Sequence, residues 1–554
     1  MKPKCQVLGT SYCIPNGVFW KGLDGSTVLC PRGGFSNGTR HPLPPSTTEP
    51  RGFEQLRTTL DPVNLDIIRD RLDFTTLIVG AEERLPNPDT PRFIDEMRKR
   101  NPWAEFRFGL LREMPDHFRD LDRLLDQPPA DRVSTNLEGN PTSSGVLVTR
   151  ILLKQLNRRA ENRLVSAEKL AVAGYVKTGS YGQNLLLDAW RKFIFTQFHD
   201  SVTATHLDPC FDELMDAHTD LARQTETIIQ QAAEQLQGRK LRMHQPAGTE
   251  TLSIFNPHSF ACTERVSLPV PAGARTVVVT DTTGHTLPLA EIRDGQAELV
   301  LKDLPPLSAV TLRVRGVAKP SKPPRKSHQS QIENEFYHLR CDDHGVVSVW
   351  EFWDGFRYEV HRLWGVAVLN VGTPSYRIED GTILVSVLRS PTLRSHMQGV
   401  AFGPDGTDHY TLDVCQGMLD KGEHEFVHAL TSFDGHFADS PMPRMSMAMN
   451  APPLVIPGKL ARLDLPQLEA CGSVIAAVKK AEQGAGLVVR LQEQRGQSEE
   501  VSLSLPRGFR HAILVNLLER QPKRLAVRQG QVRVTLRPFQ IATVLMTRTG
   551  DVER

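Results

Sequence analysis

The spacing of apolar residues changes along this chain, and that change constrains the fold more than any other feature. Between residues 146 and 237 apolar side chains recur every three or four positions, which is the period of amphipathic helices. Beyond Gly248 they alternate with polar side chains between Pro- and Gly-rich turns, which is the period of β-strands. A chain of 554 residues also exceeds what one hydrophobic core serves. We therefore expect several domains of different class.

The first 115 residues show a third pattern, in which apolar runs alternate with helix-like segments. The run Thr75–Gly80 is typical of a buried strand, and helices are predicted over about 52–72 and 91–100. Glu105–Phe108 is predicted to be a short strand, whereas the turn-forming residues of the first 50 positions predict irregular loops. Such alternation is typical of a parallel α/β sheet. Because only about two repeats are present, this region is expected to be the C-terminal part of a larger α/β domain.

The rest of the chain divides into a helical region and a β region. A three-helix middle domain is expected over residues 116–247, with helices at about 151–170, 185–198 and 208–236. The alternating strands predict a small β domain over 248–318 and a large C-terminal β-sandwich over 332–554. Between them, prolines and basic residues replace apolar ones, so 319–331 is expected to be a linker.

The composition argues against several classes of binding partner. With 66 basic and 64 acidic side chains the formal net charge is +2, which offers no global electrostatic attraction to nucleic acid or to an anionic membrane. No apolar run approaches the roughly 18 residues that span a bilayer. The eight cysteines are scattered without a CxxC pair, which favours neither a zinc finger nor a disulfide framework. We expect a cytoplasmic protein that acts on a neutral molecule.

The segment Gln197-Phe-His-Asp-Ser-Val-Thr-Ala-Thr205 is the strongest candidate for chemistry. It places His199 beside Asp200 where a predicted helix ends, and such a pair can ligate a metal or act as an acid and its orienting group. The alternative is structural: Asp200 caps the next helix and His199 packs beneath it. His206-Leu-Asp208 also has the spacing of metal ligands, but Asp208 directly before Pro209 is better explained as a helix N-cap.

The motif around His199 resembles that of glycoside hydrolase family 38, the α-mannosidases, which carry Gln-(His/Phe)-His-Asp followed by small and hydroxyl residues. Val18-Phe-Trp-Lys-Gly-Leu-Asp-Gly-Ser-Thr-Val-Leu29 is similar to a second motif of the family. Further similar segments follow in the family's order along the chain: Ile151-Leu-Leu-Lys-Gln-Leu-Asn-Arg-Arg-Ala-Glu-Asn162, Leu252-Ser-Ile-Phe-Asn-Pro257, His424-Glu-Phe-Val-His-Ala429 and Val478-Lys-Lys-Ala-Glu482.

This resemblance implies a retaining α-mannosidase with an α/β barrel-like catalytic domain, a three-helix bundle and C-terminal β-sandwich domains. Such enzymes place two carboxyl groups about 5 Å apart, one as nucleophile and one as acid/base, and use a divalent metal, most often zinc. The resemblance assigns His199 to the metal and Asp200 to the bound sugar. Glu82 or Glu83, just after the strand-like run, occupies the acid/base position, with the choice between them open. In the Gly139–Ser143 stretch, Pro141 stands where the family has an aromatic wall of the sugar pocket.

The family's other metal ligands and its nucleophilic aspartate lie upstream of the motif that begins here at Val18. The chain is therefore expected to be N-terminally truncated relative to the family and inactive alone on mannosides or mannose-containing oligosaccharides. It would need the missing segment, or a second copy, to complete the site. The alternative is a non-enzymatic carbohydrate-binding or assembly protein derived from the family.

Overall fold

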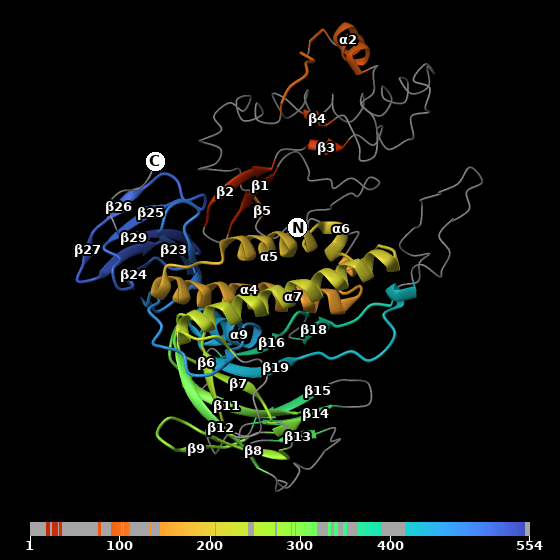
Figure 1. The fold of residues 1–554 in the computed structure, drawn as a ribbon. Coiled ribbons are helices and arrows are strands. Elements are labelled where there is room, and N and C mark those ends of the chain that lie inside the picture. Colours follow the sequence, from red (N-terminus) through yellow and green to blue (C-terminus); the bar gives the residue numbers. More distant parts are fainter. Residues whose placement is uncertain are drawn as a thin grey trace. The chain divides into compact units, whose positions relative to one another are not determined.

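The computed structural model describes residues 18–22, 25–30, 33–35, 76–78, 90–100, 102–103, 105–110, 133–134, 144–204, 206–241, 249–271, 274–289, 291–293, 295–317, 331–333, 337–341, 347–351, 364–379, 382–390 and 416–548. The chain divides into two units, Met1–Ser144 and Gly145–Arg554 (Figure 1). The predicted helix at 52–72 lies outside the described residues, as does most of the predicted linker. Within the described residues no helix is long and apolar enough to cross a membrane.

The N-terminal unit contains short strands and one helix. Strand β1 (Val18–Lys21) pairs antiparallel with β2 (Thr27–Cys30) and parallel with β5 (Val133–Ser134). Strand β3 (Gly33–Phe35) pairs parallel with β4 (Thr76–Ile78), and α2 spans Thr90–Arg100. A strand within Thr75–Gly80 and the helix at 91–100 are therefore confirmed, whereas the burial predicted for the strand stays a prediction.

Two local predictions for this unit are wrong. Strands β1, β2 and β3 lie within the first 50 residues, which were predicted to be irregular, because the apolar residues between the turns find partner strands. Glu105–Phe108 forms no strand, and Phe108 is exposed. Its two phenylalanines imitate strand alternation, but no strand among the described residues pairs with them.

The second unit begins with four helices: α4 (Ile151–Thr178), α5 (Gln183–Thr196), the single-turn α6 (His199–Val202) and α7 (Asp208–Gln237). Helices α4, α5 and α7 lie side by side (Figure 1) and cover the three predicted helical segments. Gly179 and Gly238 end α4 and α7 in the left-handed conformation, with φ of 77° and 71°. Their backbone N–H groups bond to carbonyls of the last turn, which is the usual glycine stop of a helix.

Two antiparallel sheets follow. The first has the order β10-β11-β7 and the second the order β20-β6-β12-β8-β9. Their strands are β6 (Thr249–Phe255), β7 (Cys262–Pro269), β8 (Thr276–Thr280), β9 (Thr286–Leu287), β10 (Glu291–Arg293), β11 (Gln296–Leu304), β12 (Ala309–Val317) and β20 (Leu454–Pro457). Strand β20 is contributed from far along the chain, so the sheet that contains β6, β8, β9 and β12 is not built from the continuous segment 248–318.

After these strands the described part of the chain forms a three-stranded antiparallel sheet, two antiparallel strand pairs and an unpredicted helix. The strands are β13 (Gln331–Glu333), β14 (Tyr337–Cys341), β15 (Val347–Glu351), β16 (Trp364–Asn370), β17 (Ser375–Glu379), β18 (Thr382–Ser386) and β19 (His428–Asp434). Helix α9 (Met442–Asn450) lies in a region that was predicted to contain only strands. It is too short to show a helical period, and it carries a proline in its first turn.

The C-terminal region contains two facing sheets, with orders β21-β24-β28-β27 and β22-β23-β29-β25-β26; burial alternates along β28 of the first, whereas β29 of the second buries six consecutive residues. Their strands are β21 (Leu468–Glu469), β22 (Ser473–Lys480), β23 (Leu487–Glu493), β24 (Glu499–Ser504), β25 (His511–Val515), β26 (Lys523–Leu525), β27 (Val527–Arg528), β28 (Gln531–Leu536) and β29 (Ile541–Thr547). One hydrophobic cluster joins the helices to these sheets, and it includes Leu170, Leu236, Val489 and Leu536.

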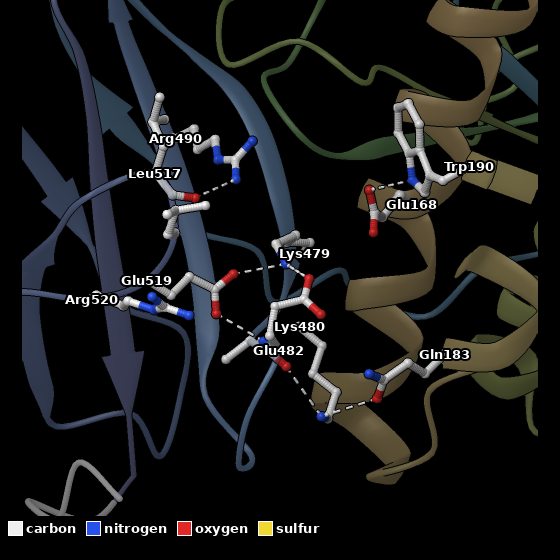
Figure 2. Close-up of polar contacts among 12 residues, drawn as sticks. Glu168, Gln183, Trp190, Lys479, Lys480, Glu482, Arg490, Leu517, Glu519 and Arg520 are labelled. Atoms are coloured by element: carbon white, nitrogen blue, oxygen red, sulfur yellow. Dashed lines mark hydrogen bonds and ion pairs between the residues drawn. The ribbon is translucent and has the colours of Figure 1, made fainter. Parts of the chain in front are cut away.

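A polar contact also links the helices to the C-terminal sheets: Lys480 Nζ of β22 donates to Gln183 Oε1 of α5 at 3.4 Å (Figure 2), and polar contacts within each side lie nearby. Glu168 accepts hydrogen bonds from the Tyr181 hydroxyl at 2.9 Å and from Trp190 Nε1 at 3.2 Å. Burial raises the pKa of Glu168, and the two donors oppose that shift. On the sheet side, Lys479 pairs with Glu519 at 2.8 Å. The helices and the C-terminal sheets are therefore joined by apolar packing that has a polar margin.

Candidate functional site

The candidate residues His199 and Asp200 lie on α6, the single turn that follows α5. Their side chains are 69% and 71% exposed, and His199 Nε2 lies 3.4 Å from Asp200 Oδ1. The Phe198 ring lies 4.4 Å from the imidazole, measured between ring centroids. Phe198 is the N-cap of α6, and no side chain caps this helix. The structural alternative for these two residues is therefore wrong, because His199 is not packed beneath a helix and Asp200 caps none.

The residues before α6 are held by a polar side chain of α4. Gln197 Nε2 donates to Asn157 Oδ1 at 2.9 Å, and the Thr196 hydroxyl lies 3.3 Å from the same oxygen. Asn157 is 6% exposed, and Thr196 is fully buried. The end of α5 is therefore tied to the middle of α4 just before the candidate pair begins.

The residues after α6 are held by a buried network around Arg150. Arg150 is 1% exposed, and its guanidinium forms an ion pair with Asp208. It also lies 3.2 Å from His206 Nδ1 and stacks over the Phe211 ring. Burial is the main cause that lowers the pKa of His206, and the positive charge of Arg150 acts in the same direction.

These contacts show what His206 and Asp208 do, for which the sequence offered metal ligation or helix capping. Both side chains are engaged with Arg150, so the structure gives this pair a packing role. The prediction that Asp208 is the N-cap of α7 is wrong by one residue: the N-cap is Leu207, and Asp208 is the first helical residue. The Asp208 carboxylate instead accepts from the backbone N–H of Gly417 at 3.1 Å.

A lysine of α4 completes the support of α6. Lys154 Nζ donates to the Thr203 carbonyl at 3.1 Å, and Thr203 is the C-cap of α6. Lys154 is 8% exposed, and burial lowers its pKa to about 7. Nearby, Asp420 Oδ2 accepts from the backbone N–H of Ile151 at 3.0 Å, so the loop before β19 covers the start of α4.

The residues present do not by themselves fit a zinc site. Structural and catalytic zinc sites use three or four protein ligands. Across the described part of the chain, no group of three or more His, Cys, Asp or Glu side chains is arranged to hold a metal ion. His199 has one carboxylate neighbour, Asp200, and a single imidazole with one carboxylate is an incomplete ligand set.

Other predicted site residues fall outside what the structure describes. Glu82 and Glu83 follow β4 but are not among the described residues, and neither is the Gly139–Ser143 stretch. The choice between the two glutamates therefore stays a prediction. Conversely, sequence reasoning missed Arg150, Lys154 and Asn157. The available signal was the position of Lys154 and Asn157 among the apolar residues of a predicted helix.

Comparison with known proteins finds family matches for two segments of the chain. Residues 142–236 match the model of the alpha mannosidase middle domain, and residues 473–544 match the model of the glycosyl hydrolases family 38 C-terminal beta sandwich domain. Alpha-mannosidase 2C1 of Homo sapiens is 28% identical over 239 residues, which cover 40% of this chain and 21% of that protein. The protein of the same name from Mus musculus gives the same identity and coverage. The matched region thus spans about a fifth of the length of these relatives.

Solved structures resemble a larger share of the chain. An alpha-mannosidase from Enterococcus faecalis V583 superposes with a TM-score of 0.65 and 15% identity, covering 96% of this chain and 82% of that one. A protein in the glycosyl hydrolase family 38 from Enterococcus faecalis gives a TM-score of 0.58 and 14% identity, with 96% and 83% coverage. At these identities the similarity concerns the fold.

Proposed function

We propose a function from the premise that this chain is a relative of the glycoside hydrolase family 38 α-mannosidases, whose middle domain and C-terminal β-sandwich domain it carries. The chain takes part in the retaining hydrolysis of terminal α-mannosides, in the breakdown of mannose-containing oligosaccharides. Its N-terminal unit belongs to a barrel-like α/β catalytic domain. The main observation behind this proposal is that His199 and Asp200 are exposed to solvent on α6. This helix lies inside the segment that matches the middle-domain model.

The roles of the residues follow the resemblance. His199 is one ligand of a divalent metal, zinc, and Asp200 accepts a hydrogen bond from a sugar hydroxyl. Glu82 or Glu83 is the acid/base. Because His199 and Asp200 are an incomplete ligand set, further ligands and the nucleophile must come from outside the described residues. The free state of Cys210, Cys262 and Cys471 supports the further proposal of a cytoplasmic location.

The test is hydrolysis of a nitrophenyl α-mannoside by the purified chain, with zinc content measured alongside. We expect weak zinc binding and no turnover above a blank, because two carboxyl groups and a complete metal site are required together. Turnover that His199→Ala abolishes would show that the chain supplies every missing group and would overturn the inactivity proposed here. Binding of mannosides without turnover in any longer form of the protein would favour the alternative of a carbohydrate-binding protein.

The acid/base is tested in a form that does turn over. Glu82→Gln and Glu83→Gln are compared on a mannobiose and on the nitrophenyl mannoside. Loss of the acid should slow the poor leaving group far more than the activated one and should leave the zinc content unchanged. If both variants keep full activity on the disaccharide, neither glutamate is the acid/base.

A further inference from the structure

Two non-glycine residues in the helical part of the second unit, described here over 144–204 and 206–241, adopt the left-handed backbone conformation. They are Arg150, with φ of 46°, and Ala204, with φ of 60°. Arg150 immediately precedes α4, and Ala204 follows α6 by two residues. Both are essentially buried. A side chain in this conformation is disfavoured by about 1–2 kcal/mol, so the surrounding contacts must hold it.

The hydrogen-bond directions around His206 can be assigned. His206 Nδ1 lies 3.2 Å from Arg150 Nη1 and 3.3 Å from the Leu207 carbonyl; because a guanidinium only donates and a carbonyl only accepts, Nδ1 can bond to one of them, and we assign it as the acceptor from the shorter contact, with Arg150. The ring proton is then on Nε2, which lies 3.3 Å from the Ser201 carbonyl and donates to it. Ser201 is the third residue of α6. A continuous relay therefore runs from the Asp208 carboxylate through Arg150 and His206 to the backbone that carries His199.

We propose that Arg150, His206 and Asp208 are positioning residues for α6, and that this relay fixes the orientation in which His199 and Asp200 face solvent. The helix needs such support because it is one turn long, has no side-chain cap and buries none of its own residues. That the relay orients His199 for metal binding rests on the proposed function. That the relay supports α6 does not depend on it.

The experiment is hydrogen–deuterium exchange of the full chain, read by mass spectrometry on peptides that cover residues 199–204. In the wild-type chain the Val202 amide bonds to the Phe198 carbonyl and the Ala204 amide bonds to Ser201. His206→Phe removes both ring hydrogen bonds and should accelerate exchange of these amides about five- to tenfold, while peptides of α4 and α7 stay unchanged. His206→Gln retains a donor that can reach the Ser201 carbonyl and should restore part of the protection.

A matched control lies on α7. His218 is 4% exposed, and neither of its ring nitrogens has a hydrogen-bond partner within the residues that the structure describes. His218→Phe therefore changes a buried histidine without removing a hydrogen bond, and α6 should exchange as in the wild type. If His206→Phe does not fold, Asp208→Asn is used instead. It removes the ion pair with Arg150 and should also accelerate amide exchange in residues 199–204.

Unchanged exchange of residues 199–204 in His206→Phe would overturn the relay. Equal acceleration in His218→Phe, or in all helices together, would show a general loss of stability and would overturn it as well. The readout uses neither sugar nor metal. Turnover of a nitrophenyl α-mannoside by the purified chain would therefore count against the proposed inactivity alone, and an unperturbed α6 counts against this inference alone.

Discussion

Lys169 is a buried cation whose effect on stability depends strongly on pH. Its side chain is 4% exposed, and Nζ donates to the carbonyls of Pro257 at 2.9 Å and Ile475 at 3.3 Å. Burial lowers the pKa of Lys169 from 10.5 to about 8. This ammonium joins α4 to the loop after β6 and to β22, so its charge state acts on three parts of the fold.

The magnitude follows from the difference between the folded and unfolded states. Between pH 8 and 10.5 the unfolded chain holds a proton at this lysine that the folded chain has released. The free energy of unfolding therefore rises with pH across this window. A shift from 10.5 to about 8 corresponds to about 3 kcal/mol, at about 1.4 kcal/mol for each pKa unit. This stabilisation is complete above pH 10.5 and is lost as the pH falls through 8.

Lys169→Met removes that dependence. We expect the difference in unfolding free energy between wild type and variant to change by about 3 kcal/mol in favour of the wild type from pH 7.5 to 10.5. Urea denaturation followed by tryptophan fluorescence measures it, and titrations shared by both chains cancel. The two carbonyls left without a donor add an offset that does not depend on pH. Lys302→Met, at an exposed lysine of β11, should show a flat difference. A flat difference for Lys169→Met too would refute the reasoning.

Two further outcomes are expected, from a buried histidine and a half-buried glycine near the same elements. Burial and the charge of Lys169 lower the pKa of His258 from 6.5 to about 4, so the wild type should lose about 3 kcal/mol of unfolding free energy relative to His258→Gln as the pH falls from 6.5 to 4. Denaturation at these pH values measures the loss, with His511→Gln, at an exposed histidine of β25, as the control; equal losses relative to both variants would contradict the expectation. Gly372 has φ of +72°, and a Cβ there would lie 2.7 Å from the Gln155 Cα of α4. Gly372→Ala should therefore lower the melting temperature clearly more than Gly295→Ala, whose φ is +75° with nothing within 4 Å; equal shifts would contradict the close approach.

The parts of the fold that could be predicted are those whose information is local. The period of three to four residues was sufficient for α4, α5 and α7, although α4 contains Gly174 and α7 has Pro209 in its first turn, and strand alternation was sufficient for most of the β region. Helix α9 was missed because nine residues with a proline in the first turn show no period. Strand β20 illustrates a different limit: its pairing with β6 joins residues about 200 positions apart, and no local pattern encodes that.

In the candidate site, too, some features are encoded locally in the sequence and others depend on tertiary packing. His199 and Asp200 could be located because a motif and a helix end coincide, but their support could not. Lys154, Asn157 and Lys169 lie on α4, a helix so widely covered that polar side chains are buried on it. A buried polar group is retained at low cost only where it is hydrogen-bonded, and the partners come from α5, the residues after α6 and the β sheets. Polar residues inside a long apolar helical pattern therefore indicate where that helix meets other elements, although the partner is decided by tertiary packing.

On α4 these residues occur in two groups: Lys154 and Asn157 contact the residues that flank α6, while Lys169 contacts the β sheets. The first group serves the candidate site and the second holds the helix to its neighbours, so substitutions in the two groups should separate effects on α6 from effects on global stability.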